Sequence, residues 1–178
     1  SIQTGSPRAV SYKGRQILTS FFKAPVASPV RVNRLSLDGD TQSDLRVHGG
    51  PDKAVYAYSA DAYPFWNERY HTQHPYGSLG ENLTFDTLDE EVIGVGDVYD
   101  LGQCRLQVTQ PRLPCYKLGI RFNDPLAPKA FNQLGRCGVY FKVVKEGEIA
   151  AGQELKLVER AEEFFSIAES YRVAMSQG

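Results

Sequence analysis

Cysteine, histidine and long apolar runs are all scarce in this chain, and each scarcity excludes a class of protein. An odd number of cysteines without CxxC spacing argues against a disulfide framework, a zinc ribbon or a thioredoxin-type site. The few histidines form no HExxH motif. No apolar run approaches the roughly 20 residues that span a bilayer, and no signal-peptide pattern opens the sequence. We therefore expect a cytoplasmic protein. The cysteines and histidines are Cys104, Cys115, Cys137, His48, His71 and His74.

The chain also lacks a dominant charge. Its formal net charge is −1 over 178 residues, so no global basic field attracts nucleic acid or an anionic membrane. We expect neither a nucleic-acid polymer nor a membrane as a partner. A local basic pocket remains compatible with this balance, because a pocket needs only local positive potential.

Short strand patterns make up most of the chain. Val30 and Val32 share one face as period-2 strands require, with Leu35 a candidate for the same face. Five further segments resemble strands: 54–58, 96–101 joined to 104–110 by a turn at Gly102-Gln103, and 138–144 joined to 154–158 by a turn at Glu146-Gly147. No βαβ rhythm links them. The pattern predicts a mainly β fold, a barrel with a few helical insertions and a short C-terminal helix.

Two helices interrupt these strands, and a third follows them. Asp61 is a candidate cap for a helix over 61–70, and Asp124-Pro125 for a helix over 124–134 that Gly135 ends. Ser166-Ile167-Ala168-Glu169 is a capping box before the last helix. We expect residues 1–160 to form the barrel domain and residues 161–178 to begin a C-terminal helical extension that is truncated or shortened.

The most informative segment is Gln110-Pro111-Arg112-Leu113-Pro114-Cys115-Tyr116-Lys117. The two prolines fix φ, so the loop should hold one shape and present the sulfur of Cys115. Neighbouring cations, Arg112 and Lys117, favour the thiolate that attacks electrophiles or binds soft metals. A structural cysteine in a turn is an equally good interpretation of this segment by itself. Cys104 and Cys137 fall inside or next to strand patterns and are expected to be buried and inert.

Three other segments carry donors for an anion. The first, Arg46-Val47-His48-Gly49-Gly50-Pro51-Asp52-Lys53, combines cations with glycines that let backbone amides approach a ligand. The second is Gly80-Glu81-Asn82-Leu83, where the Asn82 amide both accepts and donates. The third is Thr19 to Pro25, with Lys23. Read one at a time, each is more simply a turn with solvated charges.

Taken in order, these segments resemble the MOSC domain, and within that family the YiiM-type hydroxylaminopurine-resistance proteins. The match rests on Val47-His48-Gly49-Gly50-Pro51-Asp52-Lys53-Ala54 and on Gln110 to Leu118, and it extends from the N-terminus to about Glu159. The resemblance implies a β-barrel in which Cys115 lies at a pocket and ligates the molybdenum of a pterin molybdenum cofactor. Cofactor contacts are then expected from Lys23, Arg46, His48, Lys53, Asn82, Arg112 and Lys117.

The resemblance also implies an activity. YiiM-type members are linked to reduction of N-hydroxylated compounds such as hydroxylaminopurine base analogues, with electrons from a reductase partner, expected to be a flavoprotein. Two alternatives remain open: a sulfur carrier or sulfurtransferase that uses a Cys115 persulfide, and a non-catalytic cofactor-binding module. No pyridoxal-phosphate domain, the usual source of persulfide sulfur, accompanies the sequence, which favours the reductase.

Overall fold

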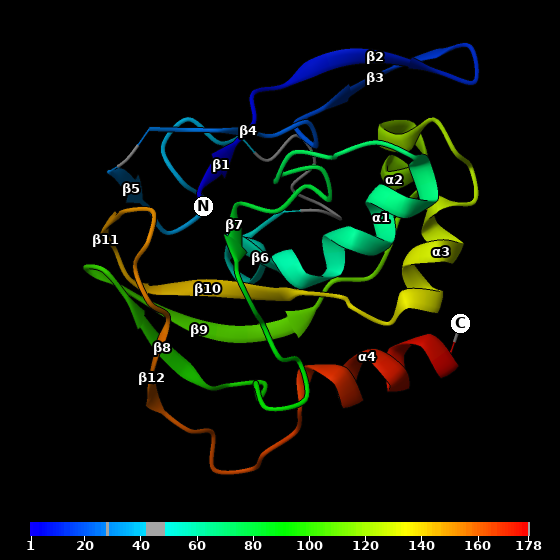
Figure 1. Cartoon of the computed structure of the whole chain (residues 1–178). Helices are drawn as coiled ribbons and strands as arrows, with labels where there is room; N and C mark the ends of the chain where they lie inside the picture. Colours follow the sequence, from blue (N-terminus) through cyan, green and yellow to red (C-terminus); the bar gives the residue numbers. More distant parts are fainter. Residues whose placement is uncertain (28, 42–48, 178) are drawn as a thin grey trace.

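The computed structural model describes residues 1–27, 29–41 and 49–177. At its centre is a six-stranded sheet with the strand order β12–β8–β9–β10–β6–β7, curled into a half-barrel (Figure 1). Neighbouring strands are antiparallel, except that β6 and β7 run parallel. The expected mainly β architecture with helical insertions is confirmed. The strands are β6 Val55–Ser59, β7 Leu83–Phe85, β8 Val98–Leu101, β9 Cys104–Pro111, β10 Val139–Lys145 and β12 Lys156–Glu159.

Three separate two-stranded sheets accompany this six-stranded sheet. One of them, the hairpin of β2 and β3, projects from the body at the top of Figure 1, away from the main sheet. Another pairs β5 with β11, where Val30 and Val32 are buried as expected, while Leu35 is exposed. The pairs are β1 Gln3–Thr4 with β4 Ala24–Pro25, β2 Arg8–Tyr12 with β3 Arg15–Thr19, and β5 Val30–Val32 with β11 Gly147–Ile149.

The predicted hairpin of β8 and β9 is confirmed. In β9 the side chains of Cys104, Leu106 and Val108 are buried, because alternate residues of a strand face the same side. Gly102 at the turn has φ +56°, and a Cβ there would lie 2.7 Å from the Glu148 carbonyl oxygen. Glycine is therefore required at this turn on both counts.

The second predicted hairpin was wrong. Residues 154–158 do not pair with β10, since β10 already has β6 on one edge and β9 on the other. A strand has only two edges, so β12 pairs with β8 instead. The chain after Glu146 forms β11, which reaches across to β5.

Helix α1, Tyr63–Tyr70, begins two residues later than the predicted range and is preceded by a 3₁₀ turn, Ala60–Ala62. Asp61 caps neither element. Its carboxylate instead forms an ion pair with Arg136 at 2.9 Å, a long-range contact that the local sequence does not reveal.

Helix α3, Ala127–Leu134, also begins later than predicted, so Pro125 lies before the helix and Pro128 occupies its first turn. The Asp124 carboxylate accepts a hydrogen bond from the Leu126 amide at 2.8 Å and stabilises the turn that leads into the helix. Gly135 ends the helix with φ +71°, as expected.

Helix α2, Tyr116–Phe122, was not predicted. It begins directly after Cys115 and ends at Asn123, which takes the left-handed conformation with φ +50°. Seven residues that include a glycine give too weak a helical pattern to distinguish from a loop. The cysteine segment therefore leads into a helix rather than a longer loop. A 3₁₀ turn, Pro51–Lys53 (η1), precedes β6.

Helix α4, Ile167–Ser176, begins with the predicted capping box. The Ser166 hydroxyl accepts from the Glu169 amide at 3.1 Å, and the Glu169 carboxylate accepts from the Ser166 amide at 3.0 Å. Ile167 and Tyr171 are buried, and the helix contacts β9, so its apolar face belongs to the core. That residues 161–178 begin a longer extension stays a prediction. Across the described residues, no helix is both long and apolar enough to span a membrane.

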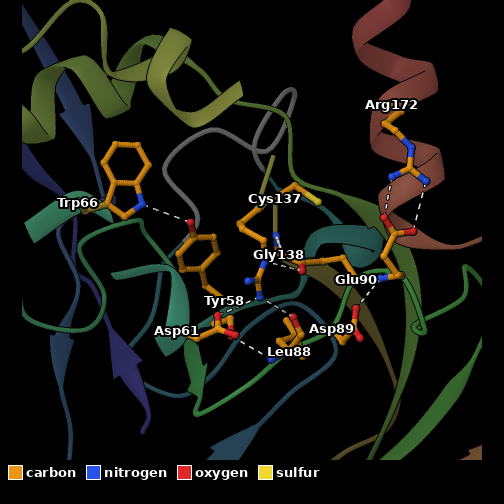
Figure 2. A network of polar contacts seen from close by, with 12 residues as sticks. Tyr58, Asp61, Trp66, Leu88, Asp89, Glu90, Cys137, Gly138 and Arg172 are labelled. Carbon is orange, nitrogen blue, oxygen red and sulfur yellow. Dashed lines mark hydrogen bonds and ion pairs between the residues drawn. The ribbon is translucent and has the colours of Figure 1, made fainter. Parts of the chain in front are cut away.

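The aromatic residues of β6 and α1 form the core between sheet and helices. Trp66 is fully buried, stacks on Phe122 at 5.1 Å between ring centroids, and donates to the Tyr58 hydroxyl at 3.3 Å (Figure 2). This aromatic cluster is part of the hydrophobic core. It fixes α1 and α2 relative to the sheet, and thereby places the start of α2.

Candidate functional site

One pocket collects the residues that the sequence singled out. It lies where the segment after β3, the η1 turn, the loop before β7 and the segment between β9 and α2 meet. Six of the eight expected site residues line it, whereas Arg46 and His48 lie outside the described residues. Their role in binding stays a prediction. The lining residues are Ser20, Phe21, Lys23, Asp40, Thr41, Lys53, Ala54, Tyr56, Gly80, Asn82, Arg112, Leu113, Cys115, Lys117 and Tyr140.

Cys115 is the half-buried cysteine of the three. It precedes the first residue of α2 in an extended conformation, with φ −136° and ψ 169°, and its carbonyl accepts from the Leu118 amide. Cys104 and Cys137 are buried, as expected, and burial raises the pKa of Cys104 to about 11. Burial also raises the pKa of Cys137. Only Cys115 presents a thiol to the pocket.

Arg112 lines the same pocket as Cys115 and is 4 % exposed. Its guanidinium donates to the Leu79 carbonyl oxygen and faces three aromatic rings at 4.9–5.4 Å from their centroids. Burial alone would lower its pKa, but the charges that Tyr56, Tyr140 and Cys115 can carry outweigh burial and raise it. The cation therefore persists, and no carboxylate within the described ranges pairs with it. The rings are those of Phe21, Tyr56 and Phe131.

Lys117 is a second buried cation at the pocket. It lies in the first turn of α2 and is 7 % exposed. Its ammonium has no hydrogen bond or ion pair with any residue of the described part of the chain. A cation that has no partner among the described residues is available to bind an anionic ligand in the pocket. Lys117 is thus a candidate anion ligand on physical grounds as well as by position.

Lys23, in contrast, already has a protein partner. Its ammonium lies 2.6 Å from an Asp40 carboxylate oxygen, and the Gly5 amide donates to that same oxygen at 2.8 Å. Burial lowers the pKa of Lys23, and Asp40 opposes that effect. Lys23 therefore contributes less positive potential to the pocket than the sequence suggests.

Asn82 is also occupied by protein groups. Its side-chain oxygen accepts from the Tyr56 amide at 3.1 Å, and its side-chain nitrogen donates to Asp40 at 2.9 Å. The amide therefore joins β6 to the Lys23–Asp40 pair. Its observed role is therefore to hold Asp40 in place, and a direct contact with a ligand stays a prediction.

Sequence reasoning missed four lining residues, Asp40, Thr41, Tyr56 and Tyr140. Tyr56 and Tyr140 lie opposite each other on β6 and β10, with ring centroids 5.0 Å apart. The Tyr56 hydroxyl donates to the Cys137 carbonyl at 2.9 Å, and burial raises its pKa well above the ordinary value. Only the strand pairing brings these tyrosines together, so no local motif could have revealed them.

A second charged cluster lies between the segment before β10 and the loop after β7 (Figure 2). Glu90 is buried, accepts from Arg136 at 2.8 Å and accepts from the Gly138 amide at 3.1 Å. Arg136 also donates to the Leu88 carbonyl and pairs with Asp61. Every charge in this cluster has a protein partner.

Comparison with known proteins decides the family. Residues 44–156 match the family model of the MOSC domain, a span that covers more than half of the chain. The chain belongs to the MOSC-domain family. Two curated bacterial relatives extend the match: the uncharacterized protein YflK of Bacillus subtilis, 40 % identical over 97 % of this chain and 78 % of that protein, and the protein YiiM of Escherichia coli, 34 % identical over 78 % and 63 %.

Solved structures agree with this MOSC assignment. YiiM from Geobacillus stearothermophilus superposes with a TM-score of 0.81 at 36 % identity, covering 99 % of this chain and 83 % of that one. YiiM from Escherichia coli gives 0.72 at 26 % identity, covering 98 % and 78 %. The protein is therefore a YiiM-type MOSC protein.

One fungal relative is much longer than this MOSC chain. A protein of Gibberella moniliformis that bears the name Reductase is 34 % identical over 90 % of this chain, which spans only 29 % of that protein. In that protein the matching region is joined to a large amount of further sequence.

Proposed function

We propose that this MOSC protein binds a pterin molybdenum cofactor, with Cys115 as the molybdenum ligand, and reduces N-hydroxylated compounds such as hydroxylaminopurine base analogues. One observation carries the proposal. Cys115 opens onto a pocket in which two buried cations, Arg112 and Lys117, have no carboxylate partner among the described residues. A soft sulfur ligand beside unneutralised cations suits a metal cofactor that carries negative charge.

The residues present fit this cofactor. A thiolate is a suitable ligand for a soft metal centre. The phosphate of the pterin requires charge-assisted donors, and Lys117 and the free N–H groups of Arg112 can supply them. Lys53 lines the same pocket and is a further candidate donor. Lys23 fits less directly, because Asp40 holds its ammonium.

Bound cofactor would supply the two-electron chemistry that converts R–NHOH, two electrons and two protons into R–NH₂ and water. The protein would do the positioning. The Leu79 carbonyl and the rings of Phe21, Tyr56 and Phe131 fix the Arg112 guanidinium in one orientation. The same rings keep water away from one side of it, which strengthens its attraction for an anion.

The relatives support an enzymatic role. The name Reductase belongs to the long fungal relative, and we extend the activity to this chain as part of the proposal. A half-exposed Cys115 would also suit a persulfide carrier. The unpartnered Lys117 favours cofactor binding over that alternative, because a persulfide on Cys115 does not require a second buried cation. The electron donor would be a reductase, which we expect to be a flavoprotein.

The decisive experiment compares Cys115→Ser with Cys104→Ala in protein made in a host that synthesises the cofactor. We expect Cys115→Ser to lose bound molybdenum and reduction of hydroxylaminopurine while its thermal midpoint stays near the wild-type value. Oxygen is a harder ligand than sulfur, and a half-exposed thiol adds little to the core. Metal content, product formation and thermal unfolding are measured on the same preparations.

Cys104→Ala serves as the control, since it removes a buried thiol from β9 far from the pocket lining. It should keep its molybdenum and activity despite a lower thermal midpoint. Full activity in Cys115→Ser would refute the role of this sulfur. Molybdenum-free wild-type protein that carries a persulfide on Cys115 would instead support the sulfur-carrier alternative.

A further inference from the structure

Charge is distributed unevenly along this nearly neutral chain. Residues 1–37 carry no Asp or Glu, whereas residues 146–177 carry seven acidic and three basic side chains. The net charge of −1 is therefore small because a basic N-terminal segment and an acidic C-terminal segment largely cancel each other. The basic side chains of residues 1–37 are Arg8, Lys13, Arg15, Lys23, Arg31 and Arg34.

The β2–β3 hairpin carries three of these cations into solvent. Arg8, Lys13 and Arg15 are exposed, and none of them forms an ion pair with a residue that the structure describes. The hairpin pairs with no other strand in the described part of the chain and stands out from the body (Figure 1). Arg8 is held over the Phe22 ring at 3.4 Å, whereas Lys13 and Arg15 lie at the turn.

The hairpin adjoins the mouth of the pocket. Tyr12, next to its turn, contacts Tyr116 at 5.9 Å between ring centroids, and Tyr116 directly follows Cys115. Leu113, which lines the pocket, is 49 % exposed, and Tyr116 is 46 % exposed. Beside Cys115 there is thus an exposed apolar patch, bordered on the hairpin side by cations. We call this surface, made of Lys13, Arg15, Leu113 and Tyr116, the basic rim.

We infer that the basic rim is the docking surface for an electron-donor protein with an acidic face around its redox centre. This inference rests on the proposed function, since reduction of R–NHOH to R–NH₂ and water needs two electrons that the chain itself does not provide. An exposed apolar centre with a border of one charge is suited to a transient complex, because the charges steer the encounter and the apolar contact orients it. Docking there brings the donor next to Cys115.

Other anionic partners fit the surface less well. A nucleic acid or an anionic membrane needs many phosphate contacts for useful affinity, and the rim offers two cations at the hairpin turn. The exposed leucine and tyrosine add contact area that a protein surface can match. Nucleic acid and lipid therefore become outcomes of the test.

The test uses charge reversal in full-length protein. Lys13→Glu/Arg15→Glu changes the basic rim, and Lys145→Glu/Lys156→Glu makes the same change in net charge at exposed positions of β10 and β12. The probe is a purified acidic flavodoxin, titrated against each variant by flavin fluorescence, with a single-stranded oligonucleotide and phosphatidylserine vesicles in parallel. Thermal unfolding checks that every variant is folded.

We expect the rim variant to bind flavodoxin at least about tenfold more weakly than wild type, and wild-type binding to weaken as salt rises from about 20 to about 200 mM. The control should bind like wild type. In cofactor-loaded protein, reduction of hydroxylaminopurine driven by dithionite should be unchanged in the rim variant, while reduction driven by flavodoxin falls.

Equal binding by wild type and rim variant would overturn the inference, as would equal losses in rim and control variants. Tighter binding of the oligonucleotide or vesicles than of flavodoxin would also overturn it. A loss of dithionite-driven activity would assign the rim to the substrate instead. If loaded wild-type protein reduces nothing with either donor, the proposed function fails, and the binding titration still decides the docking surface.

Discussion

The pocket at Cys115 and the cluster at Glu90 both contain buried charged residues, but only those of the Glu90 cluster are paired with opposite charges among the described residues. Glu90 receives Arg136 and the Gly138 amide, so its charge is neutralised and hydrogen-bonded within the fold (Figure 2). Arg112 and Lys117 are equally buried, yet no described carboxylate pairs with either. A buried charge is tolerable when paired and unfavourable when alone. The presence or absence of a partner of opposite charge therefore distinguishes a cluster that stabilises the fold from a candidate ligand-binding site.

Breaking the structural cluster should have the largest effect on stability. Glu90→Ala leaves Arg136 without its buried partner and the Gly138 amide without an acceptor. We expect a loss of about 3 kcal/mol in the free energy of unfolding, measured by urea denaturation.

Glu91→Ala is the matched control, because Glu91 also pairs with an arginine, Arg172, but on the surface with both side chains more than half exposed. Exposed pairs contribute little, so no measurable change in the thermal midpoint is expected. A similar loss in both variants would show that burial is not what distinguishes the cluster.

In the pocket, removal of a charged side chain should not lower the free energy of unfolding and could raise it, in contrast to Glu90→Ala. Lys117→Met keeps the length of the side chain and removes a charge that has no partner among the described residues, so cofactor-free protein should be as stable as wild type or about 1 kcal/mol more stable. Affinity for pyrophosphate, used as a probe of the anion site, should fall about tenfold. Urea denaturation and isothermal titration calorimetry measure the two quantities.

Lys129→Met, at an exposed position of α3, controls for the loss of one positive charge and should change neither quantity. Destabilisation by Lys117→Met as large as that of Glu90→Ala would mean that the fold itself holds Lys117. The contrast between the two regions would then disappear.

Glu81 is a third buried charged residue, and we expect it to have a smaller, pH-dependent effect on the free energy of unfolding. It is fully buried, and its partners are neutral: the Tyr63 hydroxyl, the Gly77 and Leu79 amides and the Thr84 hydroxyl. Burial raises its pKa above the ordinary value of 4.5, and these hydrogen bonds oppose the rise. The folded state therefore binds this proton more tightly than the unfolded chain does.

Protonation of Glu81 contributes its full amount to the free energy of unfolding at pH values below the ordinary pKa. This contribution is lost as the pH rises through the pKa of Glu81 in the folded state. The free energy of unfolding of wild type, relative to Glu81→Gln, should thus increase as the pH falls from about 7 to 4.5. Urea denaturation at both pH values measures it. If the free energy of unfolding of wild type relative to Glu81→Gln fell on acidification instead, the hydrogen bonds to the Glu81 carboxylate would outweigh the effect of burial on its pKa.

Much of the pocket could be predicted from the sequence because its residues fall in short, distinctive strings. The segment around Cys115, the turn at Lys53 and the loop at Asn82 all reach one pocket, and the buried position of Cys104 followed from strand periodicity. Cys137 is buried as predicted, although it lies just before β10 rather than within a strand. Helix α2 could not be predicted, because it is too short for its pattern to stand out. The partner of β12 was missed because hairpin reasoning assumes that neighbours in sequence pair in space.

The sequence by itself determined most of the residues that meet at the pocket, the alternation that buries one face of β9 and the capping box of α4. These depend on residues within a few positions of each other. Tertiary structure alone decided that Asp40 neutralises Lys23 and that Asn82 is used within the protein. It also decided that Glu90 has two partners, whereas Lys117 has none among the described residues. Such pairings join segments tens of residues apart, and their strength depends on how completely the fold removes water from both groups.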